Sequence, residues 1–492
     1  MHKLLKRFLF AVLIILSIYL LLLIPVPSNE HKIQAHQQPF SWSSDSLWNK
    51  LEADFSESRK LDTAILHIKI DSVFRIEEKL CSEMESSTIA LNDSVYNAVL
   101  FHFFSLSALV AAQPQYAHQL NVLYGRIRTA VKFQSQQVDI NSTAVRNSLY
   151  KMLYGLRAAV EEVALQADST EHILFGKEEH SATASTNILG ITVHSGDLLV
   201  SRGGAEVSAF ISRGNDYPGN FSHVALVYID ASTNIPYLIE AHIEKGVAVS
   251  SVADYVKDKK LRFMVLRPRF DLPQLKTDSM LPQKVALYAF DEAAKRHIPY
   301  DFKMNYDDSS AMFCSEVGSY AYRKNGLQLW KAVSTISSPG VENWLHSFGV
   351  EHFVTQMPSD LEYDPQLTVV AEWKDGETLF KDHLNNAVMD ALLTEADKGA
   401  EIGYNTWKLP VARVLKAYCV VLNLFGKVGK IPEGMSAVQA MKNLEFVNIF
   451  QQVKKSVALQ AETFTGEKKY KPPYWQLVKM ANAEAQNYFT KR

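Results

Sequence analysis

The spacing of hydrophobic residues changes along this chain of 492 residues and divides it into three regions with different patterns. From Leu47 to about Ala167 apolar residues recur every three or four positions, which predicts amphipathic helices. From residue 188 to residue 375 short apolar runs are separated by turns containing Gly, Asn or Pro, which predicts strands bracketed by helices. From Leu379 to the C-terminus helical spacing returns. The pattern therefore predicts a central α+β domain flanked by two helical regions.

Within the central domain, strands and helices are expected from period-2 and period-3.6 spacing respectively. The expected strands are 198–201, 221–229, 237–242, 246–250, 262–266 and 367–371, and the expected helices are 251–256, 284–296 and 314–324. Residues 168–187 are expected to form a polar connection, and Ser337 to Gly340 a loop.

An N-terminal membrane anchor is the clearest single element that the pattern predicts. Lys3, Lys6 and Arg7 precede an uncharged apolar run from Phe8 to Ile24. At about 1.5 Å per residue this run spans about 25 Å, close to the thickness of a bilayer core. A retained anchor is favoured over a cleaved signal peptide, because the run is long and no Ala-x-Ala-like site follows it. The basic flank predicts that the bulk of the chain lies on the non-cytoplasmic side, periplasmic or extracellular.

Two other apolar stretches are expected to be buried rather than membrane-spanning. Val95 to Ala112 contains His102 and has polar neighbours, so we expect a core helix. Val411 to Phe425 contains Arg413 and Lys416, whose charges disfavour a bilayer span, so a buried helix is expected there too. The domain prediction is an anchor at 1–27, a linker at 28–46, a helical domain at 47–180, the α+β domain at 188–375 and a C-terminal helical region at 376–492.

Composition narrows the classes of function. The formal net charge is -2, so no basic surplus indicates a nucleic-acid partner. Three cysteines, Cys81, Cys314 and Cys419, are far apart and form no CxxC or Cys/His ligand pattern. A structural zinc site is therefore not expected, and no metal or organic cofactor is predicted. An odd cysteine count leaves at least one free thiol.

Cys314 is the best candidate for a reactive thiol. It begins a run with helical spacing, directly after a polar stretch at 307–310. The N-terminal end of a helix favours the thiolate, which is the nucleophilic form of cysteine. The alternative is an inert cysteine on a core helix, since free cysteine is among the most buried residue types.

A cysteine nucleophile needs a base and a third group that orients the base. His223 opens an expected strand after a Gly/Asn/Pro-rich loop, and Glu240 lies near the end of the next one. If the two strands pair antiparallel, the Glu240 carboxylate can reach the imidazole of His223. A strand-end histidine and an ion-paired carboxylate without catalytic roles are the simpler alternatives. His242 and Glu244 follow in the same segment and are the rivals of Glu240 for the third position.

Several short motifs in this order resemble a known family. They are Gly196-Asp197-Leu198-Leu199, Ser222-His223-Val224-Ala225-Leu226-Val227, Tyr237-Leu238-Ile239-Glu240-Ala241, Tyr300-Asp301-Phe302 and Phe313-Cys314-Ser315-Glu316. Together they resemble the permuted papain-like amidases of the YaeF/YiiX type in the NlpC-like superfamily, in which His and Glu precede Cys. The resemblance covers about residues 188 to 330. It implies a permuted papain-like core with a small antiparallel sheet, in which Cys314 is the nucleophile, His223 the base and Glu240 the third member.

The function implied by this resemblance is a cysteine hydrolase that cleaves an amide, peptide or related acyl bond through a thioester. Its expected partners are a peptide, amide or acyl-lipid substrate and the membrane that holds the N-terminal helix. Two alternatives stay open. The lecithin–retinol acyltransferase group resembles the same core, which allows a lipid acyltransferase or thioesterase. A non-catalytic scaffold whose helical flanks carry the function is the third hypothesis.

Overall fold

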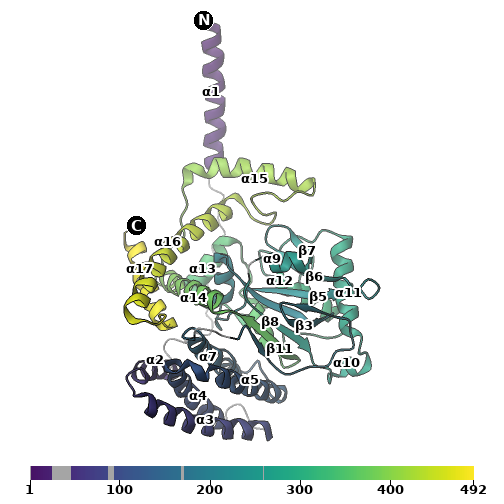
Figure 1. Cartoon of the computed structure of the whole chain (residues 1–492). Helices are drawn as coiled ribbons and strands as arrows, with labels where there is room; N and C mark the ends of the chain where they lie inside the picture. The colour runs from purple at the N-terminus through teal and green to yellow at the C-terminus, as the bar shows by residue number, and fades with distance from the viewer. Residues whose placement is uncertain (1, 25–45, 87–93, 168–170, 259, 492) are drawn as a thin grey trace.

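The computed structural model describes residues 2–24, 46–86, 94–167, 171–258 and 260–491, and Figure 1 shows their arrangement. The predicted linker 28–46 lies outside the described residues except for Ser46, which begins a helix. Along the chain, a mixed helix-and-sheet region follows an N-terminal group of helices and precedes a C-terminal group, as the hydrophobic spacing predicts. In Figure 1 the N-terminal helices lie below the sheet and the C-terminal helices at its left.

The N-terminal part is entirely helical in its described residues. Its helices are α1 (His2–Leu23), α2 (Ser46–Ser58), α3 (Thr63–Ser86), α4 (Ser94–Ala112), α5 (Ala117–Gln134), α6 (Thr143–Tyr150) and α7 (Leu156–Ala164). Helix α1 projects from the body of the molecule and meets it at its C-terminal end (Figure 1). Among the described residues, two helical segments are long and apolar enough to cross a membrane, Lys6–Leu23 and Ser94–Ala112. The second is 61% buried inside the protein, so the expected core helix is confirmed.

An antiparallel sheet of seven strands forms the centre. Its order is β1-β11-β8-β4-β5-β6-β7, and two further pairs, β2-β3 and β9-β10, lie outside it. The strands are β1 (Ile173–Phe175), β2 (Ser185–Ile188), β3 (Ile191–His194), β4 (Leu198–Gly203), β5 (His223–Ile229), β6 (Pro236–His242), β7 (Gly246–Ser251), β8 (Lys260–Pro268), β9 (Ser334–Thr335), β10 (Val354–Thr355) and β11 (Leu367–Lys374). The helices between them are α8 (Glu206–Arg213), α9 (Val252–Lys257), α10 (Pro273–Thr277), α11 (Leu281–Lys295), α12 (Cys314–Lys324) and α13 (Pro339–Phe348).

Alternate residues of the central strands pack on opposite faces of the sheet. Leu198 and Leu226 belong to the same apolar cluster as residues of α11 and α12. Their neighbours Leu199 and Val227 belong to a second cluster with the β2-β3 hairpin. Since both faces are covered, the strands are apolar on both sides, which explains why they form continuous apolar runs in the sequence.

Two sequence predictions in this region are wrong. The stretch 168–187, expected to be a polar connection, contains β1 and most of β2. Both strands are short: β1 pairs with the distant β11, with Ile173 opposite Trp373, and β2 forms a small hairpin with β3. The expected loop at Ser337 to Gly340 instead includes the start of α13. Ser338 caps this helix and Pro339 occupies its first turn, an arrangement that favours helix initiation.

The C-terminal part contains α14 (Gly376–Asp397), α15 (Leu409–Leu424), α16 (Ala437–Lys468) and α17 (Tyr474–Thr490). The helix expected from Val411 to Phe425 exists as α15, but the prediction that it is buried is wrong. Of its residues only Leu409, Pro410 and Cys419 are buried. The same apolar composition suits a core helix and a helix with one exposed apolar face, and only the tertiary contacts distinguish them.

Buried ion pairs connect both helical parts to the sheet. Arg262 on β8 donates from Nη2 to the Glu161 carboxylate of α7 at 3.1 Å and from Nε to Asp382 of α14 at 2.7 Å. Lys374 Nζ lies 3.0 Å from the same Glu161 carboxylate. Burial alone raises the pKa of Glu161, but Arg262 and Lys374 hold it well below its ordinary value. Because an unpaired buried charge is costly, these contacts fix the flanks against the core.

Candidate active site

Cys314 is the first residue of helix α12, as expected from the polar turn before it. The backbone N–H of Phe313 donates to the Glu316 carboxylate at 2.9 Å, which stabilises the start of the helix. Burial raises the pKa of Glu316 to about 9, so this carboxyl is neutral at neutral pH. It therefore adds no negative charge beside the thiol, and the helix dipole that favours a thiolate acts unopposed by it.

The first motif of the family resemblance holds α12 against the sheet. Gly196 has a φ of +93°, a conformation that favours glycine, and its carbonyl oxygen accepts a hydrogen bond from the Tyr322 hydroxyl of α12 at 2.5 Å. The next residue, Asp197, accepts two hydrogen bonds from the Arg267 guanidinium at 2.8 and 2.7 Å. The Gly-Asp pair is thus structural: Gly196 holds α12, and Asp197 holds β8, at the start of β4.

His223, Glu240 and Cys314 come together at one end of β5 and β6. The Nε2 of His223 lies 2.7 Å from Oε2 of Glu240, whose side chain is 1% exposed. The Sγ of Cys314 lies 3.8 Å from the backbone oxygen of Ser222, the residue directly before His223. Because Nε2 faces the carboxylate, Nδ1 is the nitrogen of His223 left to exchange a proton with the thiol.

The electrostatics of this cluster favour a charged imidazole. Burial lowers the pKa of His223, but its interactions with Cys314 and Glu240 outweigh burial and raise the pKa to about 9. For the carboxyl of Glu240 burial acts in the opposite direction and raises the pKa. Hydrogen bonds and charge from His223 and His242 nevertheless hold this pKa well below its ordinary value. A buried carboxylate that remains ionised beside an imidazole stabilises the imidazolium.

The strand register explains how the rivals of Glu240 are placed. Strands β5 and β6 pair antiparallel with Ala225 opposite Glu240. His242 Nε2 lies 3.2 Å from the other carboxylate oxygen, Oε1, so Glu240 is near both imidazoles. Glu244 is exposed and lines the cleft, whereas Glu240 is buried against His223. The geometry therefore favours Glu240 as the orienting group.

A cleft of about 810 Å³ opens at Cys314 and His223. One side comes from the central domain and includes Ser222, His242 and Tyr300. The other side comes from the C-terminal region and is largely apolar: Ala412, Leu415, Ile431, Pro432, Met435, Ala440, Met441, Leu444 and Val447. Sequence reasoning missed this wall, because no motif marks it and it lies about a hundred residues after the cysteine.

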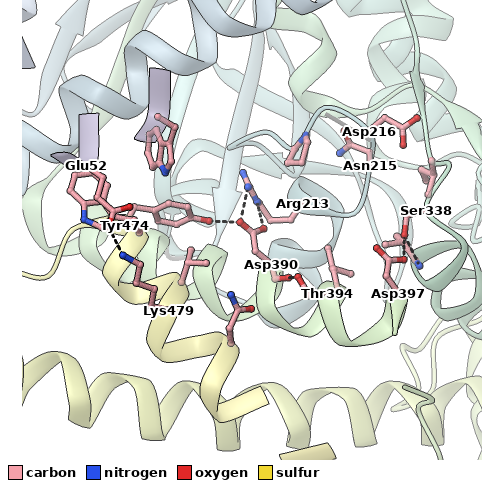
Figure 2. A pocket seen from close by; sticks show the side chains of 18 residues that line it. Glu52, Arg213, Asn215, Asp216, Ser338, Asp390, Thr394, Asp397, Tyr474 and Lys479 are labelled. Carbon is pink, nitrogen blue, oxygen red and sulfur yellow. Dashed lines mark hydrogen bonds and ion pairs between the residues drawn. The ribbon is translucent and has the colours of Figure 1, made fainter. Parts of the chain in front are cut away.

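A second cavity, of about 370 Å³, lies where α2, α14 and α17 meet the loop after α8 (Figure 2). Its polar side chains face one another rather than empty space: Arg213 donates to both oxygens of Asp390, at 2.7 and 2.9 Å, and Tyr474 donates to the same carboxylate. No cysteine or histidine is found among the described residues that line it. The polar residues around this cavity therefore connect the helical parts to the core.

Within the described part of the chain, no group of three or more His, Cys, Asp or Glu residues has an arrangement that could hold a metal ion.

Comparisons with known proteins agree with the motifs. No curated protein matches the chain. Among solved structures, the metalloprotein yiiX from Escherichia coli O157:H7 is 21% identical over 37% of this chain and 97% of its own, with a TM-score of 0.30. Residues 192–371 match the family described as permuted papain-like amidase enzyme, YaeF/YiiX, C92 family. Residues 192–371 are therefore similar to the permuted papain-like amidases of the YaeF/YiiX type, and the resemblance carried by the motifs is confirmed.

Proposed function

We propose that this protein is a membrane-anchored cysteine amidase whose triad is Cys314, His223 and Glu240. The observation that carries the proposal is the 2.7 Å contact between His223 Nε2 and Glu240, made beside a cysteine at a helix start in a segment that matches an amidase family. The exposed apolar helix Lys6–Leu23 and the basic residues before it support a retained anchor with the bulk of the chain outside the cytoplasm.

The reaction follows from these groups. His223 Nδ1 takes the proton from Cys314 Sγ, and the thiolate attacks the carbonyl carbon of an amide. Backbone N–H groups in the first turn of α12 lack intrahelical acceptors and are the candidates for binding the oxyanion. His223 then gives its proton to the leaving amine as the C–N bond breaks, which leaves a thioester on Cys314. Water, deprotonated by His223, attacks the thioester and releases the acid and the free thiol.

A second candidate is acyl transfer or thioester hydrolysis on a lipid, and the apolar wall of the cleft favours it. The two functions share the acyl-enzyme and differ in the bond that is broken and in the acceptor. Product analysis with and without an added amine or alcohol acceptor separates them. The Cys–His–Glu set and the family match argue against a non-catalytic scaffold.

The test uses the full chain with a panel of N-acyl amides, peptides and phospholipids, and with intact-mass detection of an acyl adduct on Cys314. We expect turnover of at least one amide, an adduct on the Cys314 peptide, and near-background rates for Cys314→Ala and His223→Ala. Cys81→Ala is the matched control, because Cys81 is a fully buried thiol in the helical domain. Undiminished hydrolysis by Cys314→Ala would rule out the mechanism.

A further inference from the structure

Helix α15 presents a continuous apolar stripe to solvent. The stripe residues repeat at spacings of four and three positions and range from 49% exposed at Val421 to 76% at Phe425. They are Trp407, Val411, Val414, Tyr418, Val421 and Phe425. Such spacing places them on one face of the helix. An exposed apolar face of this length indicates an interaction surface.

The charged residues in the segment that carries this stripe are all basic. From Asn405 to Pro432 the sequence contains no Asp or Glu, but it contains five basic residues. They are Lys408, Arg413, Lys416, Lys427 and Lys430. An apolar face bordered by basic residues, with Trp and Tyr among the apolar ones, is the pattern of a helix that lies in a membrane interface.

The stripe is also continuous with the membrane anchor. Arg413 Nη1 donates to the backbone oxygen of Leu22 at 2.6 Å, and the Tyr19 hydroxyl donates to the backbone oxygen of Trp407 at 2.6 Å. Figure 1 shows α15 lying across the base of α1, on the side of the body from which α1 leaves. A bilayer crossed by α1 therefore has its surface at the level of α15.

We propose that α15 is an interfacial helix, with its apolar stripe in the lipid and the exposed basic residues at its ends, Lys408 and Lys427, at anionic head groups. A second copy of this chain is the other conceivable occupant of the stripe. The contacts with α1 and the uniform positive charge favour lipid, because two copies of the stripe would bring like charges together.

The opposite face of α15 belongs to the active-site cleft. Ala412 and Leu415 line the same cleft as Cys314 and His223. Cys419 is buried with Ile431 and Met435, and Met435 also lines the cleft. A helix with its side chains is about 10–12 Å across. Only the thickness of α15 therefore separates the catalytic cleft from the lipid surface.

This placement, which rests on the proposed function, assigns a substrate class. The substrate is an amphiphile: its amide is cleaved at Cys314 at the level of the head groups, and its apolar chain lies along the wall formed by α15 and α16. Ile431, Met435 and Leu444 offer that chain an apolar surface. A wholly polar peptide would leave this wall without a contact.

The first experiment tests the position of α15 without depending on catalysis. The full chain with Cys314→Ala receives a single cysteine by Val414→Cys or Phe425→Cys, each labelled with an environment-sensitive NBD fluorophore. Ile68→Cys is the matched control, because Ile68 is an apolar residue 70% exposed on α3, which Figure 1 places at the far end of the molecule from α1. The proteins are reconstituted into vesicles of phosphatidylcholine and phosphatidylglycerol that contain doxyl-labelled lipid.

We expect a blue shift and strong doxyl quenching at positions 414 and 425, and neither at position 68. Quenching at the stripe no greater than at Ile68 would overturn the inference. A blue shift that is the same in detergent and in vesicles, without doxyl quenching, would also overturn it and would indicate contact between copies.

The second experiment tests substrate delivery. It compares kcat/KM for a long-chain N-acyl amide in vesicles with kcat/KM for a short, water-soluble analogue. The double variant Val414→Glu, Val421→Glu is expected to lower the ratio at least about tenfold, because charges are costly in the lipid interface, while Ile68→Glu leaves it unchanged. The rate of Cys314 alkylation by iodoacetamide shows separately whether the cleft is intact.

The outcomes of the two proposals are distinguishable. An unchanged ratio in the double variant, with labels in the lipid, would refute the substrate class but not the membrane position of α15. If the wild type cleaves neither amide while the labels are quenched, the proposed amidase function fails and the interfacial helix stands.

Discussion

Replacing Glu240 with glutamine keeps the size of the side chain and removes the charge that faces His223. The pKa of His223 is about 9 instead of 6.5. At about 1.4 kcal/mol per tenfold change, this difference is about 3 kcal/mol in favour of the imidazolium. Because Cys314 and Glu240 share that stabilisation, the variant should lose about 1 to 3 kcal/mol. We therefore expect kcat/KM to fall about 5- to 150-fold.

The pH profile of kcat/KM gives a second readout, and the structure predicts the direction in which it shifts. In the wild type, activity that needs the imidazolium is lost as pH rises through about 9. Without the carboxylate the pKa of His223 falls, so the alkaline limb of kcat/KM should move to lower pH in Glu240→Gln. A purely structural role for Glu240 would lower activity without moving this limb.

The assay measures kcat/KM against pH on an amide that the wild type hydrolyses, with thermal unfolding of each variant as the control for folding. Glu244→Gln is the matched variant, because Glu244 is an exposed carboxylate at the same cleft. The reasoning fails if Glu240→Gln keeps wild-type kcat/KM and its alkaline limb while Glu244→Gln or His242→Ala loses activity. The pairing of Cys314 with His223 would survive that result.

Four further predictions follow from the fold and the cleft. Iodoacetamide at neutral pH should modify Cys314 before Cys81 or Cys419, because Cys314 lines the cleft and burial raises the pKa of Cys81 to about 12; peptide mapping that finds Cys81 or Cys419 modified first contradicts this. Glu161→Gln removes one of the carboxylates that pair with the buried Arg262 and Lys374 and should cost about 3–5 kcal/mol of unfolding free energy in urea, and a loss under about 1 kcal/mol contradicts the buried network. The folded-state pKa of Glu316, about 9, is above its ordinary value of 4.5, so this residue should cost the wild type stability as pH rises between them. The decline in Tm from about pH 5 to about pH 8 should therefore be smaller in Glu316→Gln than in the wild type, and an equal decline contradicts the raised pKa. Protease added to intact spheroplasts should digest the body of the chain, and its full protection while an external marker is digested contradicts the topology.

The elements that the sequence predicts well are those whose signal is local. The strands from Leu198 to His242 are continuous apolar runs between turns, and α12 begins after a polar turn, so both are found where expected. The strand β1 was missed because its partner, β11, is about two hundred residues away, and β2 was missed because its four residues form only one side of a short hairpin with β3. The start of α13 was missed although Ser338 and Pro339 are a helix-start signal, which shows that local turn residues favour caps as well as loops.

The residues of the candidate site also fall into those that the local sequence identifies and those that depend on tertiary contacts. Cys314, His223 and Glu240 are identified by residue type, order and motif. The choice between Glu240 and Glu244 depends on the register of β5 against β6, which periodicity does not specify. The apolar wall of the cleft depends on where α15 and α16 fold back, and nothing local in their sequence refers to Cys314. The burial of α15 was predicted wrongly for the same reason.

The contacts of Arg262 bear on whether the catalytic core is an independent unit in this chain. This arginine is on β8, inside the segment that matches the amidase family, yet its buried guanidinium lies between Glu161 of the N-terminal helices and Asp382 of the C-terminal helices. Removing either flank would take away one of the carboxylates that pair with this buried charge. Removing the C-terminal flank would also strip one wall from the cleft at Cys314. The flanks therefore complete both the stability of the core and the shape of its site, and the three parts of the chain are best regarded as one enzyme.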